Sequence, residues 1–299
     1  MIDFILWVLQ NFALAPYNLV LALANPGDWL DWSNPEALTR FIYYGGSVEF
    51  FFVVFTTFLV ITALGMLWRR EILWRGVRIL EGFANGVGRF AAWAGLLMVL
   101  QQVMIVFLQR IFRVAEISLG PAGVAFTQDL SWYGEELKLY NAMVVTLAVS
   151  YTFVQGGHVR VDLIYSAVRH STKRVIDMVG CMIFMVPVVV LTYMYAWFFM
   201  WRNLVVPNPS ATSELDRMLM QSRVLRWNVE TIGFSPNGFN AYFLFKVLLV
   251  AYTVLVFLQA VAFFWRSYLE WLEGEESVGK YLDKDTLGDP EAELAAEIH

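Results

Sequence analysis

The sequence has little of what a soluble enzyme of its length normally carries. Only 16% of its 299 residues are charged, whereas a soluble domain carries about 25%. Its one cysteine, Cys181, excludes an internal disulfide and any metal site built from several cysteines. Of its three histidines none lies in a long apolar run, so a bilayer-centred haem held by paired histidines is excluded. The common zinc-hydrolase, acyl-hydrolase and phosphate-loop motifs are missing as well.

What the sequence does contain is apolar. Hydrophobic residues make up 59% of it, the mean hydropathy is +0.56, and twelve Trp, thirteen Tyr and twenty-four Phe suit aromatic belts at two membrane interfaces. We therefore predict an all-α, polytopic membrane bundle of about six spanning helices with amphipathic interfacial helices. The predicted apolar segments are Ile2–Ala24, Tyr43–Trp68, Phe83–Phe112, Leu137–Gln155, Arg174–Leu204 and Asn240–Trp265.

The first of these segments is interrupted by polar residues and has two interpretations. Ala22 and Ala24 precede Asn25 in the pattern of a signal-peptide cleavage site, but the segment begins without the basic residues that such a peptide needs. We expect a helix that spans the membrane or re-enters it. A short amphipathic helix is also expected within Ser213–Trp227, on the outer surface.

Basic residues predict the orientation, because short cytoplasmic loops are rich in Lys and Arg. Acidic residues dominate the 25–42 and 113–136 loops, which we place outside. The chain is then expected to be a multi-pass membrane protein with both its N- and C-termini in the cytoplasm. The basic residues assigned to the cytoplasm are Arg69, Arg70, Arg75, Arg78, Arg89, Arg160, Arg169, Lys173 and Arg174.

The connector 156–174 joins two apolar segments and alternates basic with apolar residues. Such a segment suits the membrane surface, with its basic side toward lipid phosphates. We call Arg160, Arg169, Lys173 and Arg174 the basic collar and expect it to face lipid.

Two charged residues within apolar segments predict a contact. Glu49 and Lys246 each lie six residues into a segment that runs inward from the outer side. An acid and a base at one depth are expected partners, because an unpaired buried charge costs several kcal/mol. The alternative is that each side chain reaches the interface separately.

Several motifs resemble a known family, the DctQ-like small membrane subunits of tripartite ATP-independent periplasmic (TRAP) transporters. The resemblance rests on the apolar helix ending at Val103–Arg113, the entry SWYGEEL with Glu136, the segment GGHVRVDLIY with Gly157, His158, Arg160 and Asp162, and the closing helix SPNGFNAYFLFKVLLVAYTVLVFLQAV. It implies structural roles for these motif residues.

The resemblance also implies an organisation and a function. Residues 83–265 correspond to a four-helix core with an outer insert at 205–239, preceded by a two-helix extension (1–82) and followed by an acidic cytoplasmic tail (266–299). The implied role is an accessory scaffold that packs against a large permease subunit of a sodium-coupled importer of organic acids, supplied by a periplasmic solute-binding protein. Sodium is expected in the large subunit, and this chain is expected to have no enzymatic activity, cofactor, metal or nucleic-acid partner.

Two other functions stay open at this stage. The first is a membrane enzyme that acts on lipid headgroups through His158, Arg160 and Asp162, although a lone acid is a poor metal site. The second is an independent carrier or channel, which would need more ionisable groups or broken helices than the apolar segments contain.

Overall fold

The computed structural model describes residues 2–119, 126–155, 168–233, 235–236 and 238–283, and it is almost entirely helical. Six helical segments are long and apolar enough to cross a membrane, which confirms the predicted fold class. They are α1 (Ile2–Ala24), α4 (Val48–Leu67), α5 (Arg70–Phe107, extended by a π-helical turn Leu108–Phe112), α6 with α7 (Leu130–Leu147 and Val149–Val154), α9 with α10 (His170–Gly180 and Val186–Arg202, joined by a π-helical turn Cys181–Met185) and α12 (Phe243–Glu273).

Short elements connect these helices. Two are hairpins, in which β1 pairs antiparallel with β2 and β3 with β4. The predicted amphipathic helix of the outer insert is confirmed as α11, whose Met218 is buried in one apolar cluster with Ile42 and Trp197. The short elements are α2 (Gly27–Leu30), α3 (Pro35–Gly45), β1 (Glu116–Leu119), β2 (Phe126–Asp129), β3 (Val205–Val206), α11 (Leu215–Gln221), β4 (Arg226–Trp227) and the 3-10 turns Ser222–Val224 and Glu275–Ser277.

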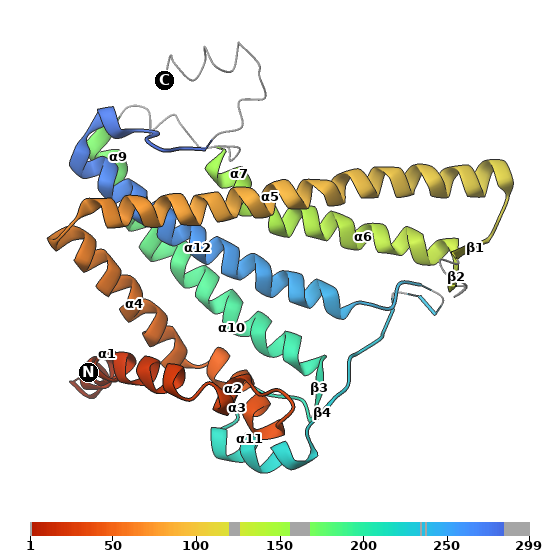
Figure 1. Ribbon diagram of the computed structural model, residues 1–299, viewed down its shortest axis with the longest axis horizontal. Coiled ribbons are helices and arrows are strands. Elements are labelled where there is room, and N and C mark those ends of the chain that lie inside the picture. Colours follow the sequence, from red (N-terminus) through yellow and green to blue (C-terminus); the bar gives the residue numbers. More distant parts are fainter. Residues whose placement is uncertain (1, 120–125, 156–167, 234, 237, 284–299) are drawn as a thin grey trace.

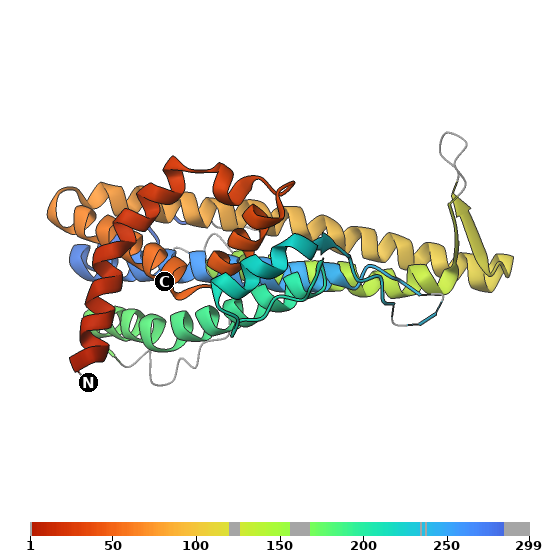
Figure 2. The same ribbon diagram turned by 90° about the horizontal axis from the view of Figure 1, so that it is seen from below.

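The molecule is elongated, and α5 runs along its long axis (Figure 1). Helices α6 and α12 lie beside α5, α10 packs on α12, and α4 joins the start of α5 at a sharp corner. Figure 2 shows the β1–β2 hairpin projecting from the far end of α5, and α1 crossing the other long helices at a steep angle. With its π-helical turn α5 has 43 residues and is about 64 Å long, roughly twice the ~30 Å hydrocarbon core of a bilayer.

Helix α5 begins thirteen residues before the predicted start of the third segment. The charged residues between 69 and 82 predicted a loop, but residues 70–82 form the first turns of α5. Apolar residues recur there every three or four positions, and Leu73, Trp74 and Val77 pack against Trp265 and Leu269 of α12. A helix with one apolar face tolerates many charged residues on its other faces. A high density of charged residues therefore does not show that a segment is a loop.

Small residues let α5 approach α7 closely. Ala84, Gly88 and Ala91 are buried on one face of α5. A β-carbon added at Gly88 would lie 2.1 Å from the β-carbon of Tyr151, so the two backbones meet at this glycine. Such spacing of small residues is common where membrane helices associate.

The two N-terminal elements dock on different helices of the core. Phe58 of α4 stacks on Trp265 of α12, whose indole Nε1 donates to Thr62 Oγ1 at 2.8 Å. On α10, Trp197 Nε1 donates to the carbonyl of Ile42 in α3 at 2.9 Å. The predicted domain boundaries after residues 82 and 265 fall inside the continuous helices α5 and α12.

Candidate functional site

The sequence-predicted residues are spread over the molecule, and the structure describes only some of them. Gly157, His158, Arg160 and Asp162 lie outside the described residues. Glu136, Arg169, Lys173, Arg174, Glu49 and Lys246 are described, and each has a distinct environment.

Glu136 joins α6 to α5. Its carboxylate accepts from Gln101 Nε2 at 3.0 Å and from the Tyr140 hydroxyl at 3.1 Å, while the same Gln101 nitrogen donates to the carbonyl of Tyr133 at 3.0 Å. The neighbouring Glu135 accepts from the backbone N–H of Phe239 at 2.9 Å and so holds the segment that leads into α12. Both acids of the motif therefore tie α6 to other parts of the bundle, Glu136 to α5 and Glu135 to the segment before α12.

The basic collar divides into exposed and internal residues. Arg169 is exposed at the start of α9, and Lys173 is half-buried one turn later. Arg174 does not face lipid as predicted. Its guanidinium lies 2.8 Å from Glu270 of α12 and donates to Asp177 at 3.2 Å, and its side chain is only 15% exposed. The prediction failed here because the sequence does not show which acids lie opposite a basic residue.

The contact of Arg174 is one end of a buried ion network, defined as Glu81, Arg174, Arg266 and Glu270. Arg266 of α12 donates to both carboxylate oxygens of Glu81 in α5, at 2.7 and 2.5 Å. It also lies 3.6 Å from Glu270, so cations and anions alternate across three helices. Glu81, Arg266 and Glu270 are 4%, 8% and 2% exposed. Since paired guanidinium–carboxylate groups orient one another, the network fixes the register of α5, α9 and α12.

The chain beyond α12 returns over this network. Gly274, with φ of 84°, turns the chain, and the carbonyl of Lys280 accepts from Arg266 Nη1 at 3.0 Å. Further along, Asp283 accepts from Asn85 Nδ2 and Arg89 Nη2 of α5, both at 3.1 Å. The described part of the predicted acidic tail is thus a strap across α5, and α12 itself continues eight residues beyond the predicted boundary.

The predicted contact between Lys246 and Glu49 is wrong. Lys246 is 7% exposed and donates to Glu230 of the outer insert at 3.2 Å, with the rings of Phe199 and Tyr242 beside its ammonium group. Glu49 is exposed in the first turn of α4. Burial raises the pKa of the Tyr44 phenol, and the negative charge of Glu49 raises it further. The predicted second segment was in fact two helices with a break at Gly46–Ser47, so Glu49 lies at a helix end.

A pair of substitutions distinguishes the two assignments. We expect Glu230→Gln to destabilise the purified protein by about 1 kcal/mol, because the pair is partly solvated and two rings still face the ammonium group. The matched change Glu49→Gln should leave the midpoint of thermal unfolding in detergent unaltered. A larger loss from Glu49→Gln than from Glu230→Gln would contradict the observed pairing.

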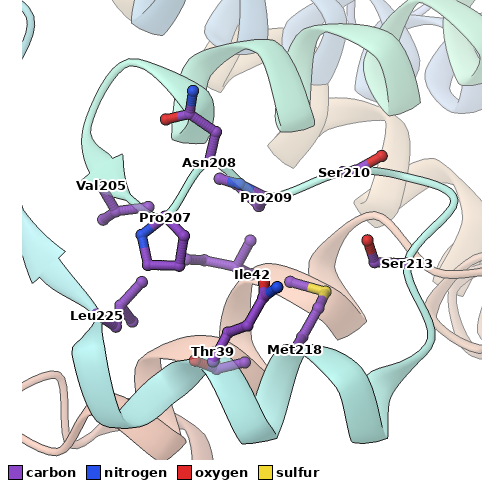
Figure 3. A pocket seen from close by; sticks show the side chains of 11 residues that line it. Thr39, Ile42, Val205, Pro207, Asn208, Pro209, Ser210, Ser213, Met218 and Leu225 are labelled. Carbon is purple, nitrogen blue, oxygen red and sulfur yellow. The ribbon is translucent and has the colours of Figure 1, made fainter.

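Two cavities are lined by described residues, and each has room for about one water molecule, about 20 Å³. The first lies between α3, α11 and the segment after β3, and Figure 3 shows Ile42, Met218 and Pro207 around it. The second is apolar and lies between α4, α12 and the π-helical turn before α10. Neither is large enough for a carboxylate solute. Among the described residues no three His, Cys, Asp or Glu side chains are grouped as metal ligands would be.

A comparison with known protein families shows which family part of the chain matches. Residues 122–225 match the family described as tripartite ATP-independent periplasmic transporters, DctQ component. These residues are a DctQ segment. The resemblance seen in the sequence is therefore confirmed, and it indicates a multi-pass membrane component of a TRAP transporter, a transport family and not an enzyme family. No curated protein and no solved structure matches the chain.

The DctQ segment begins after β1 and includes β2, α6, α7, α9, α10, β3 and α11. Two of the motifs, around Glu136 and residues 156–165, lie inside it, while the α5 and α12 motifs lie outside it. Side-chain contacts connect the DctQ segment to both flanking helices. Glu136 contacts Gln101 of α5, and Arg174 contacts Glu270 of α12. Helices α5 and α12 are thus packed with the DctQ segment in one bundle.

Sequence reasoning missed the buried ion network. Glu81 was assigned to a loop, and Arg266 and Glu270 to the tail. One signal was available, since Arg266 and Glu270 are four residues apart and flank the apolar Leu269, as expected for a buried helix face. The pairing of Arg266 with Glu81, 185 residues away, had no local signal.

Proposed function

We propose that this chain is the accessory membrane subunit of a sodium-coupled, binding-protein-dependent importer of organic acids. The observation that carries the proposal is the DctQ match at residues 122–225. In this function the chain packs against a large permease subunit, which binds the solute and sodium. A periplasmic solute-binding protein supplies the solute.

The internal contacts support a scaffold role. Polar ties join the helices at both ends of the bundle, through Glu136 and Gln101 at one end and the ion network at the other. A scaffold needs such rigidity, because its partner must move while it stays in place. The cavities described above hold about one water molecule each, which agrees with a solute site in another chain.

Large apolar side chains on the lateral surface support a membrane-embedded subunit. Phe90 on α5 is 67% exposed, and Phe184 and Leu191 on the α9–α10 segment are 71% and 68% exposed. In water these exposed apolar side chains would be a liability, whereas lipid or a permease subunit covers them without cost.

The distribution of charge supports an inner-membrane orientation with the ion network in the cytoplasm. The start of α5, whose first turns carry Arg70, Arg75 and Arg78, lies at the same end of the molecule as α9 and the end of α12 (Figure 1). Because cytoplasmic loops are enriched in basic residues, this end is the cytoplasmic one in our proposal.

Reconstitution tests the function. Proteoliposomes that contain the chain together with its large permease subunit should accumulate labelled carboxylates when a sodium gradient and the binding protein are supplied. Proteoliposomes with the chain alone, or with the permease subunit alone, should stay at background. Uptake by the chain alone would contradict the accessory role, and undiminished uptake without it would show that the chain is not a subunit of the importer.

A further inference from the structure

Helix α1 is placed in a way that a spanning helix would not be. If α1 ran across the membrane beside α4, Trp7 would lie about 25 Å deeper than Ala24, close to the inner end of α4. In the structure the Trp7 ring lies 5.7 Å from that of Phe52, only about 6 Å along α4 from its outer start. Phe12 also contacts Phe52, at 5.0 Å. The Phe52 ring of α4 thus contacts two rings of α1 that are five residues apart in the chain. This arrangement is expected where two helices cross.

The pictures agree with these contacts. Helices α10, α12 and α5 run along the long axis of the molecule in Figure 2, and α1 runs across it. The end of α1 is tied to the outer elements, because Trp29 Nε1 of α2 donates to the carbonyl of Ala22 at 2.9 Å. Both the crossing point and the end of α1 therefore lie near the outer ends of the helices.

Polar residues of α1 recur every seven positions. Asp3, Gln10 and Tyr17 form one exposed row and lie within about 40° of one another at 100° per residue. Asn11 and Asn18 are partly buried and lie nearer the side that packs on α4. Phe12 and the buried Ala15 lie on the side of the helix away from the exposed row, and Trp7 lies between the two sides. A polar stripe of this kind suits a helix that lies in the membrane plane, since every stripe residue then reaches the headgroups at once.

Charge gives a third, independent argument. Residues 1–39 contain no Lys or Arg, so the charges of α1 and of the loop after it do not favour a cytoplasmic position. Spanning would also place Gln10 and Asn11 near the middle of the hydrocarbon, where polar side chains are expensive.

We propose that α1 is an in-plane helix embedded in the outer leaflet, with its polar stripe toward the outer headgroups and Asp3 on the outer side. The ligand of this surface is the lipid of that leaflet. Because the stripe carries no basic residue, it needs no anionic lipid, and the apolar sides of α1 are buried among acyl chains. The chain then crosses the membrane five times, and α1 widens its footprint in the outer leaflet only.

Cysteine labelling of the full chain in intact native cells tests this placement. Single cysteines are introduced in a Cys181→Ser background, and an impermeant thiol reagent is added before and after permeabilisation. We expect Asp3→Cys and Gln10→Cys to be labelled from outside, as the outer control Ser33→Cys is. Leu9→Cys, the matched variant on the apolar side, should be labelled several-fold less, and Ser171→Cys should need permeabilisation.

Each other outcome overturns the proposal. Labelling of Asp3→Cys only after permeabilisation, with Gln10→Cys blocked, means that α1 spans the membrane. Blocked labelling at both positions that is relieved when the large permease subunit is deleted means that a protein, and not lipid, covers the stripe. Equal labelling of Leu9→Cys and Gln10→Cys means that α1 lies in water.

Discussion

Replacing Arg266 with methionine is expected to destabilise the protein by about 3–5 kcal/mol, because a buried carboxylate then loses its partner. Arg266 makes two hydrogen bonds to Glu81 and one to the carbonyl of Lys280, and its side chain is 10% exposed. Methionine keeps much of the apolar volume of arginine, so the loss reports charge more than packing. Thermal unfolding in detergent, followed by tryptophan fluorescence, measures the effect.

An exposed ion pair on α5, the helix that carries Glu81, provides the matched control. Glu71 and Arg75 of α5 form an ion pair at 3.0 Å, but their side chains are 62% and 67% exposed. Solvent screens such a pair, so Arg75→Met should change the unfolding midpoint little. The double variant Glu81→Met with Arg266→Met should regain much of the lost stability, because an apolar pair replaces a buried ionic one. Losses that simply add in the double variant would show that the two side chains do not depend on each other.

The sequence was informative about the helices because hydropathy is a local property. All six apolar segments appear as helices, and α11 was predicted from the spacing of its apolar residues. The start of α5 was missed because charges on one face were taken for a loop, although Leu73, Trp74 and Val77 marked the buried face. Helix ends were therefore misplaced wherever an amphipathic turn continued an apolar span.

Contacts between helices were much less predictable than the helices themselves. Position along a segment gives depth in the membrane but not the direction in which a side chain points. Glu49 and Lys246 were paired on depth alone, and the real partner of Lys246 is Glu230, in the outer insert. Arg174 was assigned to lipid because basic and apolar residues alternate in the connector, a pattern that does not show that Glu270 lies 2.8 Å away. The family motifs could be found in the sequence because they are local.

Substitution of Gly88 is the second change from which we expect a large effect. Even Gly88→Ala should destabilise the protein by about 1–3 kcal/mol, because the added methyl group would lie 2.1 Å from the β-carbon of Tyr151. The clash involves an atom attached directly to the α7 backbone, so no side-chain rotation relieves it. Helices α5 and α7 must separate, and α7 leads directly into the connector that carries the family motif.

Two other glycines of α5 make the test specific. A β-carbon at Gly82 or Gly86 would meet nothing within 4 Å. Since alanine favours a helix over glycine by about 1 kcal/mol, Gly82→Ala and Gly86→Ala should be neutral or slightly stabilising. The same thermal unfolding measurement compares all three variants, which differ only in what the methyl group meets. If Gly88→Ala were as stable as Gly86→Ala, the close approach of α5 and α7 at this glycine would be disproved.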